Sequence, residues 1–174
     1  MLKMNTISIV LVIGILIFVY LKYRKEREKS FNTEKLTAFA IKEISDFAEK
    51  HKDETFYGFS IDANLLCMNS IEQFNLTLKH YEKKYDKESN TKVFENLKNN
   101  TGDWKYQGFA EFDDENGFNM IEYNEHYHEN DDEQLSSEYA KAMNIVIMNL
   151  KESQVFSKFN KTENFFINRV EHNY

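Results

Sequence analysis

The pattern of hydrophobic and polar positions divides the chain into a short apolar beginning and a long amphipathic remainder. Residues 4–21 contain no charged side chain and are rich in Ile, Leu, Val and Phe. A helix of this length spans about 27 Å, close to the roughly 30 Å hydrocarbon core of a bilayer. The pattern therefore predicts one transmembrane helix that crosses the lipid bilayer at residues 4–21.

Basic residues immediately after this segment predict its orientation. One lysine precedes the apolar run, whereas five basic residues follow it: Lys22, Arg24, Lys25, Arg27 and Lys29. Because basic flanks stay on the cytoplasmic side, we expect an inner-membrane, single-pass protein with its C-terminal domain in the cytoplasm. The five side chains are expected to contact phospholipid head groups. A cleaved signal peptide is the alternative, but no small-x-small site follows Leu21.

After the predicted anchor, residues 1–29, the pattern becomes that of one domain over residues 30–174. Apolar positions at helical spacing predict helices near 33–51, 71–87, 91–99 and 135–150. Runs of aromatic and branched residues predict a hairpin of strands 56–62 and 65–68, two further strands at 104–112 and 118–121, and a last strand at 164–170. The segment at 118–121 could instead begin a helix.

This order of elements lacks strict alternation of strand and helix. Helices are interspersed with pairs of strands instead. The expected fold is α+β, a single domain with a mostly antiparallel sheet packed by helices, preceded by the N-terminal transmembrane helix.

Charge excludes one class of partner. The first 29 residues hold six of the 22 basic and two of the 29 acidic residues, so the remainder carries a net charge of about −11. Binding to nucleic acid depends on clustered Lys and Arg, so a nucleic-acid partner is not expected. The single cysteine, Cys67, lies in an apolar run and is expected to be a buried thiol.

Metal-ligand residue types concentrate at residues 125–133, where His126 and His128 lie among carboxylates. In a strand, a His-x-His pair would point both imidazoles to one face and could bind zinc. No HExxH or CxxC pattern supplies a third ligand, and carboxylates before a helix also favour its dipole. A solvated loop that caps the next helix is the preferred interpretation, with no cofactor, and a metal-dependent hydrolase is the alternative.

Aromatic residues make up 15% of the chain. Most lie on predicted buried faces, and packing accounts for them. Those outside these faces are candidates for contacts with a protein partner. The candidates are Tyr57, Trp104, Tyr106, Tyr123 and Tyr127.

Three short segments resemble a known family. They are residues 55–62, Thr-Phe-Tyr-Gly-Phe-Ser-Ile-Asp; residues 69–72, Asn-Ser-Ile-Glu, before a helix; and residues 102–106, Gly-Asp-Trp-Lys-Tyr. Together with the order of elements, they resemble the bacterial family called domain of unknown function 4303. The resemblance implies a small cytoplasmic α+β protein and, because some members lie near secreted polymorphic toxins, an immunity role. The N-terminal anchor departs from the usual member, and the family offers no catalytic residues.

These observations lead to one preferred hypothesis and two alternatives. The preferred function is a membrane-anchored, non-enzymatic protein-binding domain, possibly an immunity protein that neutralises a toxin. The alternatives are the hydrolase that would use His126 and His128, and a structural scaffold at the membrane.

Overall fold

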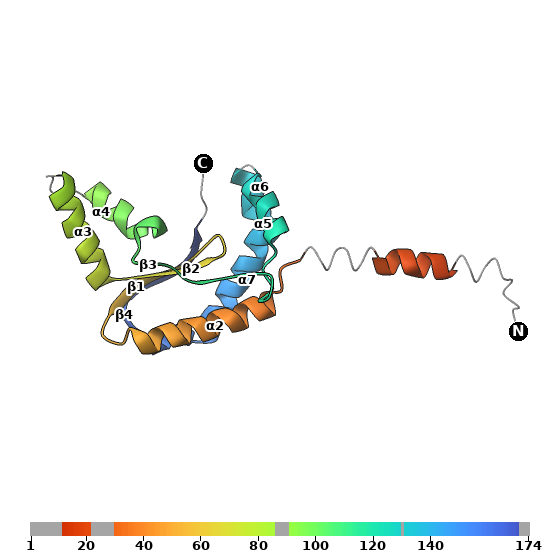
Figure 1. Ribbon diagram of the computed structural model, residues 1–174, viewed down its shortest axis with the longest axis horizontal. Helices are drawn as coiled ribbons and strands as arrows, with labels where there is room; N and C mark the ends of the chain where they lie inside the picture. The colour runs from red at the N-terminus through yellow and green to blue at the C-terminus, as the bar shows by residue number, and fades with distance from the viewer. Residues whose placement is uncertain (1–11, 22–29, 86–90, 130, 171–174) are drawn as a thin grey trace, which may run out of the picture. The chain divides into compact units, whose positions relative to one another are not determined.

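The computed structural model describes residues 12–21, 30–85, 91–129 and 131–170 (Figure 1). The chain separates into two compact units, Met1–Ser30 and Phe31–Tyr174. In the first unit, residues 12–21 are helical. Residues 4–11 of the predicted span and the basic residues 22–29 lie outside the described residues. Among the residues that are described, no helix is long and apolar enough to cross a membrane.

The second unit begins with helix α2, Thr33–Lys50, as the apolar spacing predicts. Asn32 caps it, because its side-chain oxygen accepts a hydrogen bond from the backbone N–H of Lys35 at 3.0 Å. The buried side of the helix carries side chains at three- and four-residue spacing: Leu36, Thr37, Ala40, Ile44, Phe47 and Ala48. A single amphipathic face therefore attaches α2 to the core.

The predicted hairpin is confirmed as strands β1, Thr55–Asp62, and β2, Leu65–Ser70. Two residues connect the strands, and the first of them, Ala63, has a φ of 54°, as tight hairpin turns require. Helix α3, Ile71–Tyr85, follows at once. The hydroxyl of Ser70 accepts a hydrogen bond from the N–H of Gln73 at 3.2 Å, so the predicted N-cap is present.

Further along the chain lie α4, Thr91–Asn99, the 3₁₀ turn η1, Thr101–Asp103, and strand β3, Tyr106–Glu111. The next predicted strand, 118–121, is absent, and the alternative of a helix is correct. Asn119 accepts hydrogen bonds from the N–H groups of Ile121 and Glu122 and thereby begins α5, Met120–Tyr127. Helices α6, Asp131–Ser136, and α7, Glu138–Glu152, follow. The 3₁₀ turn η2, Val155–Lys158, then leads into β4, Asn160–Val170.

The sheet has the order β3-β2-β1-β4. Strands β1, β2 and β3 pair antiparallel, but β4 pairs parallel to β1, so the sheet is mixed and the expectation of a mostly antiparallel sheet is wrong. The physical reason is the connection. The hairpin turn between β1 and β2 reverses the chain, whereas the helical crossover between β3 and β4 returns it to the start of β1. Residue alternation identifies a strand but does not encode its direction.

Helices cover both faces of the sheet (Figure 1). The larger core joins α2 and α7 to β1, β2 and β4, and its fully buried members include Leu36, Ile44, Met143, Val146 and Leu150. The smaller core lies under α3 and α4 and comprises Tyr57, Cys67, Phe74 and Trp104. Burial raises the pKa of the Cys67 thiol to about 12, as expected for a structural cysteine.

Candidate functional site

Strand β4 departs from regular pairing close to its beginning. Phe56 of β1 pairs with Lys161, but Gly58, two residues later, pairs with Phe166, five residues later. Residues 162–165 therefore bulge away from β1. A Cβ atom on Gly58 would lie 2.5 Å from Cζ of Phe166, so glycine allows the ring to pack directly against β1.

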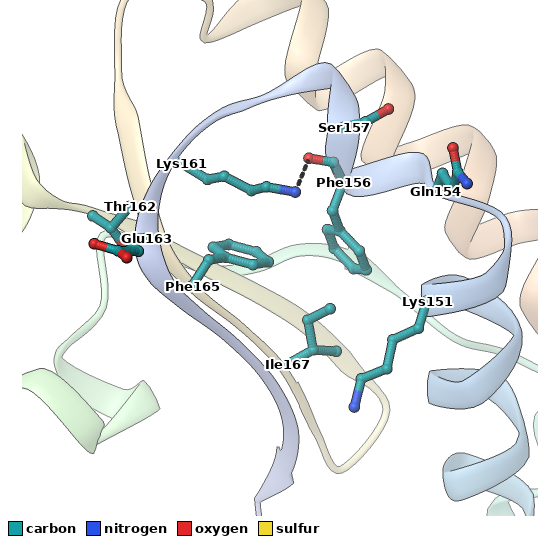
Figure 2. A pocket seen from close by; sticks show the side chains of 9 residues that line it. All are labelled: Lys151, Gln154, Phe156, Ser157, Lys161, Thr162, Glu163, Phe165 and Ile167. Carbon is teal, nitrogen blue, oxygen red and sulfur yellow. Dashed lines mark hydrogen bonds between the residues drawn. The ribbon is translucent and has the colours of Figure 1, made fainter.

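This bulge forms one wall of a surface depression that we call the edge groove. The groove lies between β4, the turn η2 and the end of α7, and it has a volume of about 480 Å³. Figure 2 shows the side chains that line it: Lys151, Gln154, Phe156, Ser157, Lys161, Thr162, Glu163, Phe165 and Ile167. Its size is that of a typical ligand site.

The floor of the edge groove is apolar. Phe156, which is 4% exposed, comes from η2, and half-buried Phe165 and Ile167 come from β4. The rings of Phe156 and Phe165 lie 5.5 Å apart between centroids and are tilted by 48°, a favourable arrangement for an aromatic pair. These side chains also pack against the larger core, so the core holds the floor in place.

Two lysines lie at the rim of the groove. The ammonium group of Lys161 donates a hydrogen bond to the carbonyl of Phe156 at 3.4 Å and lies 5.9 Å from the centre of the Phe165 ring. Lys151 extends from α7 toward β4, below Ile167 in Figure 2. Glu163 supplies the one carboxylate among the lining side chains. The groove thus combines an apolar floor with positive charge in a chain whose net charge is −7.

A strained residue connects α7 to the groove. Gln154 has φ 56° and ψ 22°, the left-handed conformation that usually follows a helix at glycine. A non-glycine residue in this conformation costs about 1–2 kcal/mol. The backbone of Gln154 accepts a hydrogen bond from Ser157 at 2.9 Å, which stabilises the turn. Such strain recurs at binding sites, where the surrounding structure maintains it.

The predicted aromatic contact residues occupy separate places in the structure. Tyr57 and Trp104 are buried, with 2% and 4% exposure. Both donate a hydrogen bond to the carbonyl of Lys98, at 3.1 and 2.9 Å, and so satisfy an acceptor in the last turn of α4. These two side chains therefore hold α4 against the sheet and do not face solvent.

The other three candidates differ from one another in exposure. Tyr106 is half-buried and donates a hydrogen bond to Glu54. Tyr123 is half-buried against the larger core, whereas Tyr127 is 45% exposed on α5. The edge groove contains none of the five predicted aromatic residues.

The two histidines lie in a helix and at its end, not in a strand or loop. His126 belongs to α5, and His128 is the C-cap of the same helix. Residues two apart on a helix point in different directions, so the His-x-His spacing does not bring the imidazoles to one face. Within the described part of the chain, no group of three or more His, Cys, Asp or Glu side chains could hold a metal ion.

His126 instead packs inside the domain, where it is 6% exposed. Its Nδ1 lies 2.8 Å from the hydroxyl of Ser137, which itself accepts the N–H of Ala140 at the start of α7. The imidazole thus shares a hydrogen bond with the hydroxyl that caps α7. Burial, together with the charge of Arg169, lowers the pKa of His126 to about 4, so the ring is neutral near pH 7.

Sequence reasoning did not identify a second polar cluster, which surrounds Glu54. The carboxylate of Glu54 accepts hydrogen bonds from Ser70 at 2.5 Å and from Tyr106, and lies 3.0 Å from Nδ1 of His51. Burial raises the pKa of Glu54, but the three hydrogen bonds together outweigh it and lower the pKa overall. The cluster links the end of α2 to strands β2 and β3, which indicates a structural role.

The edge groove was also not predicted. Phe165 and Ile167 fall in the predicted last strand, but nothing in their spacing indicates a bulge. Gln154 provides no sequence signal either, because glycine is the usual residue in its conformation. The apolar run at residues 164–170 was the one sequence signal in this region, and it indicated a strand rather than a binding surface.

Comparisons with known proteins agree with the resemblance seen in the sequence. The model of the family described as "Domain of unknown function (DUF4303)" matches residues 36–174. The match begins within α2 and leaves the N-terminal apolar segment outside it. No curated protein and no solved structure matches the chain. Because the model covers most of the chain, the protein belongs to the DUF4303 family.

Proposed function

We propose that this protein is a membrane-anchored, cytoplasm-facing binding protein that captures another protein through the edge groove, most concretely an immunity protein that neutralises a toxin. The observation that carries the proposal is the groove itself. A preformed apolar floor with two lysines at its rim suits recognition, and the one carboxylate beside them is Glu163.

The composition of the groove favours binding over catalysis. Its lining offers lysine, glutamine, serine, threonine and glutamate but no histidine or cysteine. A serine nucleophile requires a neighbouring base, and no side chain that lines the groove is hydrogen-bonded to the Ser157 hydroxyl. His126, whose pKa is lowered, is buried and hydrogen-bonded to Ser137, the N-cap of α7, so it lies away from the groove. These features support a binding site rather than a catalytic site.

The N-terminal segment supports the proposed anchor. Residues 4–21 are uncharged, and the large apolar side chains of the described part, residues 12–21, are all exposed in the structure. Exposed apolar surface of this extent calls for a partner or a lipid environment. Attachment to the inner membrane would raise the local concentration of the binding domain where an incoming toxin emerges.

Topology can be tested independently of binding. A reporter that is active only in the cytoplasm, fused after Tyr174, should be active, and a reporter that needs the periplasm should be silent. Membrane fractionation of the same fusion should place it in the inner membrane. The opposite reporter pattern would overturn the cytoplasmic orientation.

Co-expression tests the immunity role most directly. Each toxin gene that neighbours the gene of this protein is induced in a bacterium that expresses the wild-type chain or the double variant Lys151→Glu/Lys161→Glu. Wild type should restore growth with one toxin, and the variant should not, because reversing both rim charges removes the complementarity of the groove.

The matched control is Lys79→Glu/Lys92→Glu. It makes the same change of charge at exposed positions on α3 and α4, away from the groove. Immunoblots verify equal amounts of each protein. Failure to neutralise any neighbouring toxin would contradict the immunity role, and full protection by the groove variant would contradict the assignment of the site.

A further inference from the structure

The geometry points to an extended segment of the partner protein as the occupant of the edge groove. This segment pairs with the outer edge of β4 along residues 166–170, and it places an apolar side chain on the groove floor and a carboxylate beside Lys151 or Lys161. The inference rests on the proposed function, because it names the chemistry of the partner at the same site.

The first argument is the edge position of β4. The strand order puts β4 at one side of the sheet, and no described strand pairs with its outer side. Residues 166–170 pair in regular register with residues 58–62 of β1. A five-residue stretch of regular strand extends about 16 Å and can accept another strand by main-chain hydrogen bonds.

The second argument is the bulge beside this regular stretch. Natural sheets protect an edge with bulges, because a bulge disturbs the row of backbone donors and acceptors. Here the bulge covers residues 162–165 and leaves 166–170 regular. An added strand is thus directed to the second half of β4, next to the floor residues Phe165 and Ile167.

The third argument concerns the side chains of an added strand. Alternate residues of a strand point to the same face of the sheet. Ile167 lies on the face that lines the groove, so every second side chain of an added strand lies beside it, toward α7. In Figure 2 the space bounded by Phe156, Phe165 and Ile167 faces Lys151 of α7. An apolar side chain fills this space and excludes water from the floor.

The fourth argument is charge. Lys151 and Lys161 flank the floor, whereas the chain as a whole carries a net charge of −7. The electrostatic attraction between the domain and a carboxylate of the partner is strongest at this rim, because much of the rest of the chain is acidic. Glu163, on the same strand as Lys161, limits the attraction, so one or two acidic residues suit the groove better than a long acidic run.

A library of random twelve-residue peptides displayed on phage tests the inference on the full-length protein in mild detergent. Enriched peptides should carry Asp or Glu within two positions of an aromatic or branched apolar residue. Synthetic versions should bind Lys151→Glu/Lys161→Glu at least about tenfold more weakly than wild type, since two exposed attractions become repulsions. The control Lys79→Glu/Lys92→Glu should bind as wild type does.

NMR of the full-length protein with the tightest peptide provides a second readout that needs no variant. The largest shifts and slowed amide exchange should fall in residues 166–170 and the groove floor. Shifts elsewhere, enrichment of basic or purely apolar peptides, the absence of enrichment, or equal binding by the groove variant would overturn the inference. So would a wild-type dimer that the groove variant converts to a monomer in sedimentation, since the occupant would then be a second copy of the chain.

The outcome is separable from that of the proposed function. Peptide binding at β4 without neutralisation of a toxin would retain this inference and refute the immunity role. If the groove variant still neutralises a toxin and no peptide is enriched, the immunity role would be retained and this inference refuted.

Discussion

The two faces of the sheet differ in how completely helices bury them. On one face, α2 and α7 contribute a continuous apolar core with fully buried Leu36, Ile44, Met143 and Leu150. On the other face, Phe74 is the one buried residue of α3, and α4 buries none of its side chains. The first face can support most of the stability of the domain. The second depends on a few contacts, such as the hydrogen bonds from Tyr57 and Trp104 to the carbonyl of Lys98 in α4.

The candidate site lies on the better-packed face. The groove floor residue Phe156 is buried against Phe59 of β1, with 5.0 Å between ring centroids. A binding surface built on such a core is held in one geometry before a partner arrives, which lowers the entropic cost of association. The α3–α4 face lacks this support, although its exposed Leu76 and Tyr85 give it apolar surface too. Rigid support, rather than apolar exposure alone, distinguishes the two faces.

The largest expected effect compares leucines on the two faces. Leu36→Ala on α2 removes a fully buried side chain and should lower the free energy of unfolding by about 2–5 kcal/mol. Leu78→Ala on α3 removes a half-buried side chain and should cost about 1 kcal/mol or less. Urea denaturation of both variants provides the measurement. Equal losses would show that the two faces contribute alike.

The next effect concerns pH. The pKa of His126 is about 4 in the folded protein, below its ordinary value of 6.5. Between pH 6.5 and pH 4 the unfolded chain binds a proton that the folded protein does not, so stability falls as the pH falls through this range. The contribution to the free energy of unfolding, complete above pH 6.5, is at most about 3 kcal/mol, because solvent screening reduces it.

His126→Asn tests this expectation, because the asparagine amide can donate to or accept from the Ser137 hydroxyl but does not titrate. The variant should lose stability less steeply than wild type between pH 6.5 and 4 in urea titrations. His80→Asn, at an exposed position of α3, is the matched control and should retain the wild-type slope. If the free energy of unfolding changes equally with pH in wild type and His126→Asn, the claim that His126 is buried and neutral would be refuted.

The smallest expected effect concerns the hydrogen bonds that hold α4 against the second face of the sheet. Tyr57→Phe removes the hydrogen bond to the carbonyl of Lys98 and the acceptor for the amide of Asn69. We expect a loss of about 1–2 kcal/mol and faster amide exchange in α4, while α7 stays unchanged. A loss of partner binding without loss of stability would instead make Tyr57 the contact residue that the sequence suggested.

Local signals in the sequence predicted most elements of the fold. Asn32 and Ser70 marked helix starts, and apolar spacing identified α2 and α7, because these features depend on near neighbours. The direction of β4 was mispredicted because it depends on the helical crossover. Helix α5 replaced the preferred strand because the cap at Asn119 outweighed the β-propensity of the residues around it.

The candidate site was much less predictable than the fold. The edge groove arises because the Phe166 ring packs on Gly58 and displaces residues 162–165, which is a contact between distant parts of the chain. Likewise, Tyr57 and Trp104 appeared free for a partner until their common acceptor, the carbonyl of Lys98, was known. Both cases depend on tertiary contacts that spacing does not encode.

Native-state hydrogen exchange tests the central difference between the faces most directly. The account predicts that amides of α2, α7 and β1 exchange only through global unfolding, whereas amides of α3 and α4 exchange through local opening at a clearly lower free energy. As the urea concentration rises, the amides of α3 and α4 should keep the lower free energy of opening until global unfolding dominates exchange for both sets of amides. Protection of α3 and α4 equal to that of α7, or α7 opening before α3, would contradict the account.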